Sequence, residues 1–297
     1  MEITFLGTSG MQPTKDRNLS SLLLRYKAEN ILIDCGEGTQ RQFRIADISP
    51  IKITKILITH LHGDHINGLP GFLQNLHKNE YKKTLEIYGP KGIKNLIKLV
   101  LTIANLGNNK LKVNVNEIEP GIFLKTKDYF LTAKKLNHSC ECYGYSFTEA
   151  DKRKMDMKYL KKFKLKKHVL LGKLQKGKDI VYEGKKIKVK DATYIEKGKK
   201  ITLIADTSYT EQATSLAKDS NLLICESTYN KEHKQKAREY KHLTSEDAAN
   251  IAKKSKSKKL ILTHFSQRYK DVSGLLKEAK KIFKETSIAN DFMKVNV

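Results

Sequence analysis

The stretch Thr59-His60-Leu61-His62-Gly63-Asp64-His65 decides the fold of this 297-residue chain. It follows a short apolar run and has the pattern His-x-His-x-Asp-His. His60 and His62 are two positions apart, so an extended backbone points both side chains to the same side. Asp64 and His65 lie in the turn that comes next and can reach a second metal. Because imidazole and carboxylate are both zinc ligands, the pattern predicts metal binding at the end of a strand.

Several other segments share one shape, a short apolar and β-rich run that ends in a polar or acidic residue. With the run that leads into the motif, 56–60, included, these segments are residues 30–34, 56–60, 129–138, 201–206, 222–226 and 260–264. Strand ends in layered α/β proteins gather at one edge of a sheet, where ligands and metals bind. His138, Asp206 and His264 end three of these runs and are candidates to complete the site. Taken singly, each is as readily an ordinary polar residue at a strand end.

The helical segments lie between these runs. Residues 90–103 carry apolar side chains three and four positions apart, which predicts an amphipathic helix. Thr244 is placed to cap another helix, with Asp247 at its third position. Residues 275–283 predict a further helix. The order of strands and helices favours two stacked sheets covered by helices, in two similar halves.

Residues 150–200 depart from this pattern, with 19 Lys or Arg against 6 Asp or Glu. Residues 151–168 are compatible with a helix, but its apolar face is thin. Glycines interrupt the remainder of the segment. We expect a protruding arm or insertion here rather than core. The alternative is a solvated, lysine-rich face without a specific role.

The composition points to a polyanion as partner. The net charge is +25, from 57 Lys and Arg against 32 Asp and Glu, which favours nucleic acid. Compositional bias is the alternative, because Lys greatly outnumbers Arg. No stretch is apolar over the length that crosses a membrane, and residues 1–10 lack the basic head of a signal peptide. The four cysteines form no Cys-x-x-Cys pair and suit a reducing compartment. We therefore expect a soluble, cytoplasmic protein without a membrane partner.

These motifs, in this order, resemble the metallo-β-lactamase superfamily. Within it, the chain is similar over nearly its whole length to the short form of ribonuclease Z. Beyond the histidine motif and His138, the matching segments are residues 7–10, 13–18, 34–40, 143–145, 205–207, 225–229, 242–244 and 262–269. Residues 13–18 resemble that family's substrate-contacting loop. The family's arm usually carries a Gly-Pro element, whereas residues 169–173 contain no proline.

The resemblance implies an α/β fold, a four-layer αββα metallo-β-lactamase sandwich. It implies one domain over residues 1–297, with residues 150–200 inserted as a protruding basic arm, or exosite, that binds tRNA. It also implies two zinc ions per subunit. The implied metal ligands are His60, His62, Asp64, His65, His138, Asp206 and His264, with Asp206 as the bridging ligand.

The implied activity is that of a zinc-dependent endoribonuclease that removes 3′ trailers from precursor tRNAs. A metal-bound hydroxide would attack the phosphodiester and leave a tRNA 3′-hydroxyl. Asp64 would also accept the proton of the attacking water, and His242 would donate one to the leaving oxygen. From its spacing alone, His242 is as readily a polar residue at a helix entry. Glu226 would orient His242.

The expected partners are precursor tRNA and a second copy of the chain. In the expected homodimer, the arm of one subunit presents tRNA to the site of the other. Two alternatives keep the fold: another two-zinc phosphodiesterase or exoribonuclease, and a small-ester hydrolase. A third is an RNA-binding protein with a structural zinc site. Structural zinc usually has four closed ligands, often cysteine, whereas the His and Asp set here suits two metals with open positions.

Overall fold

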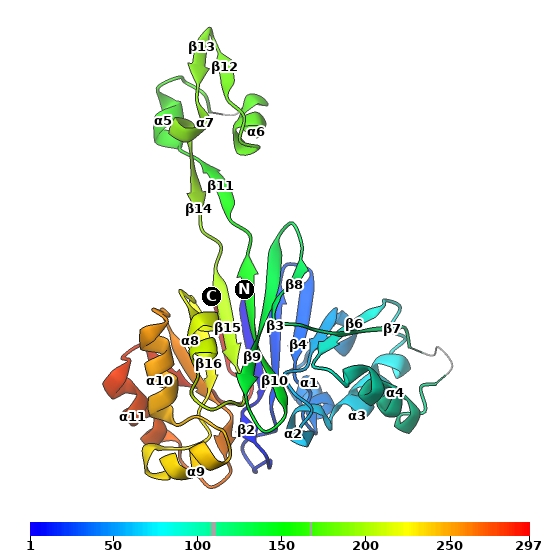
Figure 1. Ribbon diagram of the computed structural model, residues 1–297. Coiled ribbons are helices and arrows are strands. Elements are labelled where there is room, and N and C mark those ends of the chain that lie inside the picture. The colour runs from blue at the N-terminus through cyan, green and yellow to red at the C-terminus, as the bar shows by residue number, and fades with distance from the viewer. Residues whose placement is uncertain (108–110, 167) are drawn as a thin grey trace. The chain divides into compact units, whose positions relative to one another are not determined.

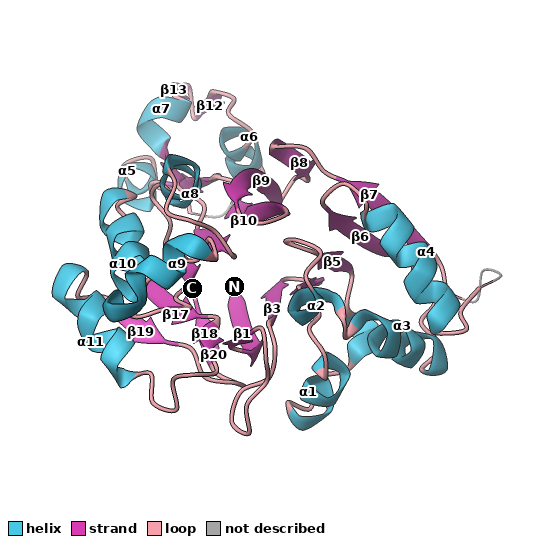
Figure 2. Ribbon diagram, turned by 60° about the horizontal axis from the view of Figure 1, so that its bottom comes forward, coloured by secondary structure: helices cyan, strands magenta, loops and turns pink. Residues whose placement is uncertain are grey.

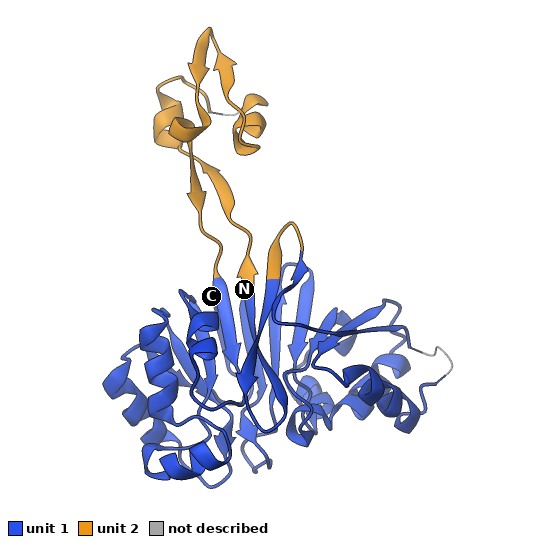
Figure 3. Cartoon of the chain, viewed as in Figure 1, with its two compact units in different colours: residues 1–125, 131–147, 200–297 blue, residues 126–130, 148–199 orange. Residues whose placement is uncertain are grey.

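The computed structural model describes residues 1–107, 111–166 and 168–297. These residues form two compact units (Figure 3). The first unit contains residues 1–125, 131–147 and 200–297, and the second contains residues 126–130 and 148–199. The segment 150–200, predicted as an inserted arm, falls almost entirely in the second unit, with residue 167 outside the described residues.

The first large sheet has its strands in the order β20-β1-β3-β4-β5-β6-β7. The strands from β20 to β4 pair antiparallel, and those from β4 to β7 pair parallel. Their bounds are β1 Glu2–Gly7, β3 Ser21–Tyr26, β4 Glu29–Ile33, β5 Lys55–Leu57, β6 Leu85–Gly89, β7 Val113–Glu117 and β20 Lys294–Asn296. The parallel strands β4 and β5 deliver Asp34 and the histidine motif to one edge of this sheet.

The second large sheet has the order β19-β17-β16-β15-β10-β9-β8. Strands β15, β16, β17 and β19 run parallel. The bounds are β8 Gly121–Lys125, β9 Tyr129–Asn137, β10 Glu141–Glu149, β15 Lys200–Ile204, β16 Leu222–Glu226, β17 Leu260–Thr263 and β19 Thr286–Ile288. Because the three apolar runs at 201–206, 222–226 and 260–264 become adjacent parallel strands, their polar ends meet at one edge.

Helices cover the outer faces of both sheets (Figures 1 and 2). Against the first sheet lie α1 (Thr39–Ile45), α3 (Leu69–Lys78) and α4 (Ile93–Ile103). Against the second lie α8 (Glu211–Ala217), α10 (Ser245–Lys254) and α11 (Ser273–Ile282). The inner faces meet each other, as in the aromatic pair Tyr26 and Phe147 with ring centroids 5.1 Å apart. The four-layer αββα arrangement expected from the sequence is confirmed.

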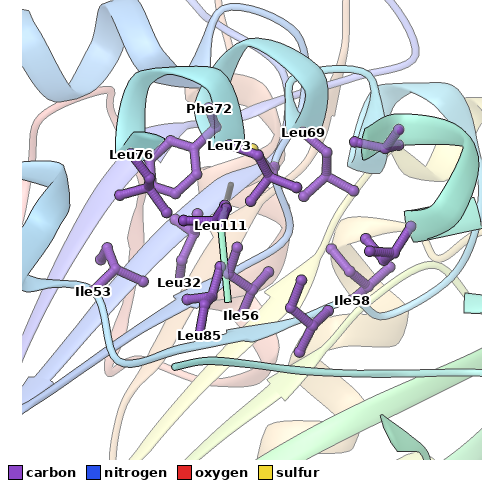
Figure 4. Close-up of a cluster of buried hydrophobic side chains, with 14 of the residues drawn as sticks. Leu32, Ile53, Ile56, Ile58, Leu69, Phe72, Leu73, Leu76, Leu85 and Leu111 are labelled. Carbon is purple, nitrogen blue, oxygen red and sulfur yellow. The ribbon is translucent and has the colours of Figure 1, made fainter. Parts of the chain in front are cut away.

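The core of the first half shows how a helix is fixed to its sheet (Figure 4). Phe72, Leu73 and Leu76 of α3 are fully buried against strand residues such as Leu32 and Ile56. Side chains of this kind each contribute about 1.5–3 kcal/mol by leaving water. This packing fixes α3 close behind the histidine motif, which precedes it in the chain.

The helices expected from sequence form close to their predicted bounds. Residues 93–103 are helical within the predicted 90–103. Thr244 and Asp247 form a capping box at the start of α10, with Thr244 Oγ1 accepting from the Asp247 amide at 3.2 Å. The last helix begins at Ser273, two residues before its predicted start.

The second unit has a core of its own. Its strands are β11 (Lys152–Met155), β12 (Ile180–Tyr182), β13 (Lys185–Ile187) and β14 (Thr193–Glu196), and its helices are α5 (Met157–Lys161), α6 (Leu170–Gln175) and α7 (Val189–Ala192). Leu160, Leu174, Ile180 and Ile187 are buried together. Residues 151–168 are compatible with a helix by sequence, and residues 157–161 form one, whereas residues 152–155 form a strand because they pair with 193–196, a partner remote in sequence. The segment 169–173, which lacks proline, lies at the start of α6.

None of the described helices is long and apolar enough to cross a membrane. The four cysteines, which all lie in the described part of the chain, are free.

Candidate metal centre

The histidine motif places its side chains through a change from extended to helical backbone. Strand β5 ends at Leu57, and a short connection leads to His62, whose extended backbone precedes the one-turn helix α2 (Gly63–Ile66). His60 and His62 therefore come from the segment between strand and helix, while Asp64 and His65 come from the helical turn. The two pairs of side chains belong to two different groups of potential ligands.

The seven predicted ligands lie together in two groups. The first group is His60, His62, His138 and Asp206, and the second is Asp64, His65, Asp206 and His264. Within each group, the potential ligand atoms all lie within 4.8 Å of one another. Residues from four separate strand ends thus converge, and Asp206 belongs to both groups.

The potential ligand atoms of each group lie close to one another. His62 Nδ1 lies 3.1 Å from His60 Nε2 and 3.2 Å from His138 Nε2. In the second group, His65 Nε2 lies 3.3 Å from His264 Nε2, and the Oδ2 atom of Asp64 lies 3.4 Å from both. Such atoms are lone-pair donors facing a common centre, which is the arrangement that a cation stabilises.

The buried carboxylate of Asp206 supports the same conclusion. Its Oδ1 atom is buried and has no hydrogen-bond donor among the described residues, although His264 Nε2 lies 3.3 Å away. Its Oδ2 atom lies 3.6 Å from His65 Nε2 and 3.7 Å from His60 Nε2. An unpartnered buried carboxylate oxygen is costly, and a metal ion on either side of Asp206 would remove that cost. The residues present therefore fit a metal site.

Groups behind the histidines fix their orientation. The Nδ1 atom of His65 meets Asp34 Oδ2 at 2.8 Å, and that of His138 meets the Lys241 carbonyl oxygen at 3.0 Å. These acceptors favour the tautomer that carries its proton on Nδ1, which leaves Nε2 free for a metal. The Nδ1 atoms of His60 and His264 likewise meet the hydroxyl oxygens of Thr59 and Thr228, at 3.0 Å each.

Sequence reasoning assigned no site role to Asp34, although the residue ends one of the apolar runs. Its Oδ1 atom accepts from the Thr59 amide at 2.8 Å, and its Oδ2 atom accepts from the Thr59 hydroxyl at 2.9 Å. Asp34 and His264 both have a φ of 57°, in the left-handed region. Such backbone persists only where the surroundings hold it. The available signal was that Asp34 follows the end of strand β4, which is parallel and adjacent to strand β5, the strand that leads to the histidine motif.

The site shifts the pKa values of its members. Burial raises the pKa of Asp206, but the imidazoles of His264 and His65 outweigh burial and hold it well below its ordinary value. Burial lowers the pKa of His65, but Asp34 and Asp206 raise it well above its ordinary value. Burial holds the pKa of His60 well below its ordinary value. The Asp206 carboxylate is therefore ionised, as a metal ligand must be.

His242 and Glu226 form a pair beside the two groups. His242 Nδ1 lies 3.1 Å from Glu226 Oε1, and the Glu226 side chain is fully buried. Glu226 is itself held by the Thr207 amide at 2.8 Å and the Thr228 hydroxyl at 2.6 Å. Burial lowers the pKa of His242, but Glu226 outweighs it and raises the pKa to about 9. The pair is thus a protonated imidazole oriented by a carboxylate.

An open cavity of about 610 Å³ gives access to these groups. Its lining includes the site residues Asp64, His138, Asp206 and His242. It also includes two basic residues, Lys236 and Arg268, and two aromatic residues, Tyr229 and Tyr240. The Arg268 guanidinium lies 5.1 Å from the centre of the Tyr229 ring. Cationic and aromatic side chains beside a metal centre suit a ligand that carries phosphate and bases.

The chain is similar to proteins of known family over its full length. The family model described as "Anti-Pycsar protein Apyc1" matches residues 1–286. Ribonuclease Z of Methanothermobacter thermautotrophicus is 38% identical over 298 residues, covering 100% of this chain and 97% of the relative.

Solved structures agree with this assignment. The short form of human tRNase Z matches with a TM-score of 0.74 and 28% identity, over 100% of this chain and 99% of that one. The metallo-β-lactamase fold protein YhfI from Bacillus subtilis matches with a TM-score of 0.72 and 21% identity, over 99% and 98% of the two chains, and supports the fold. The family resemblance inferred from the sequence is confirmed: the chain belongs to the family that the Apyc1 model describes and to the ribonuclease Z family, and it has the metallo-β-lactamase fold.

Proposed function

We propose that this chain is a tRNA 3′-processing endoribonuclease that uses two zinc ions per subunit. The observation that carries the proposal is the pair of ligand groups that share Asp206 and open, beside the His242–Glu226 pair, into a cavity with basic walls. The relatives are named ribonuclease Z, and the human structure is named a tRNase. Precursor tRNA with a 3′ trailer is therefore the proposed substrate.

The donor set supports zinc as the metal. Imidazole and carboxylate together suit zinc, and each group offers four donor residues. One ion would be held by His60, His62 and His138, and the other by Asp64, His65 and His264. Asp206 would be a ligand of both ions. When bound, two such ions lower the pKa of the attacking water and offset charge on the phosphoryl oxygens.

The chain's own residues would handle the protons. Asp64 belongs to the second ligand group and lines the cavity, so it would orient the attacking water and take its proton as the new phosphorus–oxygen bond forms. The bond from phosphorus to the 3′ oxygen then breaks. His242 would give its proton to that oxygen, which leaves a tRNA 3′-hydroxyl and a 5′-phosphate on the trailer. Glu226 would keep the His242 ring in place.

The second unit would bind the body of the tRNA. Its lysines would contact phosphates without reading bases, so recognition would rest on the shape of the RNA. The family resemblance supports a homodimer in which the unit of one subunit serves the site of the other. A cytoplasmic location accords with this substrate.

The first prediction concerns the cut itself. We expect the wild-type protein with zinc to cut a precursor tRNA once, next to the base before the trailer, because the metal centre and the basic cavity act on one phosphodiester. Asp64→Ala and removal of the metal by a chelator should each abolish the cut, with a loss of at least about 10³-fold for the variant. Mapping the product ends by sequencing gives the answer.

Uncut precursor in the presence of metal-loaded wild-type protein would contradict the tRNA assignment. A cut that survives in Asp64→Ala would contradict the role of Asp64 alone.

The second prediction separates proton donation from other roles of His242. A natural 3′ oxygen is a poor leaving group and needs a proton, whereas p-nitrophenolate leaves without one. His242→Asn should therefore lower kcat for precursor tRNA by about 10²-fold or more. It should change kcat for bis(p-nitrophenyl) phosphate by less than about fivefold. Equal losses on both substrates would show that His242 is not the proton donor.

The third prediction concerns the second unit. Lys158, Lys161 and Lys166 are exposed there, and replacing all three by Ala should weaken tRNA binding. The slope of the logarithm of the association constant for tRNA against the logarithm of the salt concentration should decrease in magnitude by roughly 0.7–0.9 for each phosphate that the variant no longer neutralises. The matched control replaces by Ala three exposed lysines of helix α11 in the first unit, namely Lys277, Lys280 and Lys281. If both triple variants change the slope equally, the second unit is not the specific binding surface.

A further inference from the structure

A loop at the rim of the cavity contacts Asp64 directly. Strand β2 (Ser9–Gly10) pairs with β18 (Phe265–Ser266), next to His264, and the chain then leaves as a loop over residues 11–18. The backbone amide of Met11 donates to Asp64 Oδ2 at 2.8 Å. This hydrogen bond fixes one oxygen of the carboxylate, so the loop determines how Asp64 faces the site.

The conformation of Met11 requires support from elsewhere. Its φ is 61°, in the left-handed region, and the residue is 73% exposed. A non-glycine residue in this region costs on the order of 1 kcal/mol or more. Since the exposed side chain cannot supply that support, the loop must be held at its two ends.

Asp291, near the C-terminus, ties these two ends together. Its Oδ1 atom accepts from the Thr8 hydroxyl at 2.7 Å, and its Oδ2 atom accepts from the Asn18 amide at 2.7 Å. Gln42 Nε2 donates to the same Oδ2 atom at 3.0 Å. Thr8 precedes the loop and Asn18 ends it, so one carboxylate closes the base of the loop.

Arg17 reinforces the same closure. Its Nη1 atom donates to the Thr8 hydroxyl oxygen at 2.8 Å and to the Ala289 carbonyl at 2.9 Å. Its Nη2 atom donates to Asn290 Oδ1 at 3.1 Å, and its guanidinium lies 5.0 Å from the centre of the Phe265 ring. The guanidinium is therefore engaged with the protein itself.

We propose that Asp291 and Arg17 are positioning residues that hold the loop of residues 11–18 so that the backbone amide of Met11 orients Asp64. The inference rests on the proposed metal site at Asp64 and is independent of the substrate.

The experiment measures zinc affinity and hydrolysis of bis(p-nitrophenyl) phosphate. Asp291→Asn places an amide NH₂ against groups that are themselves donors, and Arg17→Lys keeps the charge but loses the planar fork. Both variants should lower zinc affinity by about 10–100-fold, as loss of groups that orient a ligand does. Both should lower kcat for the diester by about tenfold or more.

The matched control is Glu285→Gln, which removes one negative charge from an exposed side chain of the same C-terminal region. It should leave zinc affinity and kcat unchanged. Thermal unfolding of each variant checks that the protein is folded. If Asp291→Asn and Arg17→Lys behave like Glu285→Gln, the positioning role is overturned. If Asp291→Asn does not fold, the zinc affinity and kcat of Arg17→Lys alone test the positioning role.

This experiment separates the inference from the proposed function. If the wild-type protein does not cut or bind tRNA, the proposed substrate fails, but the zinc and diester measurements still test the anchor at Asp291. If tRNA is cut and Asp291→Asn has normal zinc affinity and normal kcat, the anchor fails while the proposed function stands. A double variant of Arg17 and Asp291 should lose no more than about threefold beyond the worse single variant, because both act through Thr8.

Discussion

The carboxylate of Asp206 is the constraint on which the rest of the site depends. It is almost fully buried, it belongs to both groups of ligand residues, and one of its oxygens has no hydrogen-bond donor in the described part of the chain. A buried charge of this kind is stable only beside compensating positive charge. The surrounding imidazoles supply some of it, and a metal in each group would supply the remainder. The fold has to bring several remote strand ends within a few ångströms to make this possible.

The two sheets achieve this through parallel strands that end at the same edge. In the first half, β4 and β5 deliver Asp34 and the histidine motif. In the second half, β15, β16 and β17 deliver Asp206, Glu226 and His264. Hydrogen bonds behind the ligands then set their orientation, and two of the residues involved, Asp34 and His264, have left-handed backbone. Such backbone costs free energy that packing of the helices on the outer faces offsets.

Much of this was predictable because strand ends are local signals. The histidine motif and the runs before His138, Asp206 and His264 identified all seven residues that the structure brings together, although their role as ligands stays a prediction. The capping box at Thr244 was equally local. Residues whose partners are remote in sequence were missed: Asp291 meets Thr8 and Asn18 only in the folded chain. The same cause explains why residues 152–155, which are compatible with a helix by sequence, form a strand instead: their partner strand, 193–196, is remote in sequence.

The central claim, that one buried carboxylate serves two metal positions, can be tested by counting ions. Native mass spectrometry of the zinc-loaded protein would be compared for the wild type, His138→Ala and Asp206→Ala. The account predicts about two zinc ions for the wild type, loss of one in His138→Ala, and loss of tight binding at both positions in Asp206→Ala. Two ions retained in Asp206→Ala, or a single ion in the wild type under saturating zinc, would contradict it.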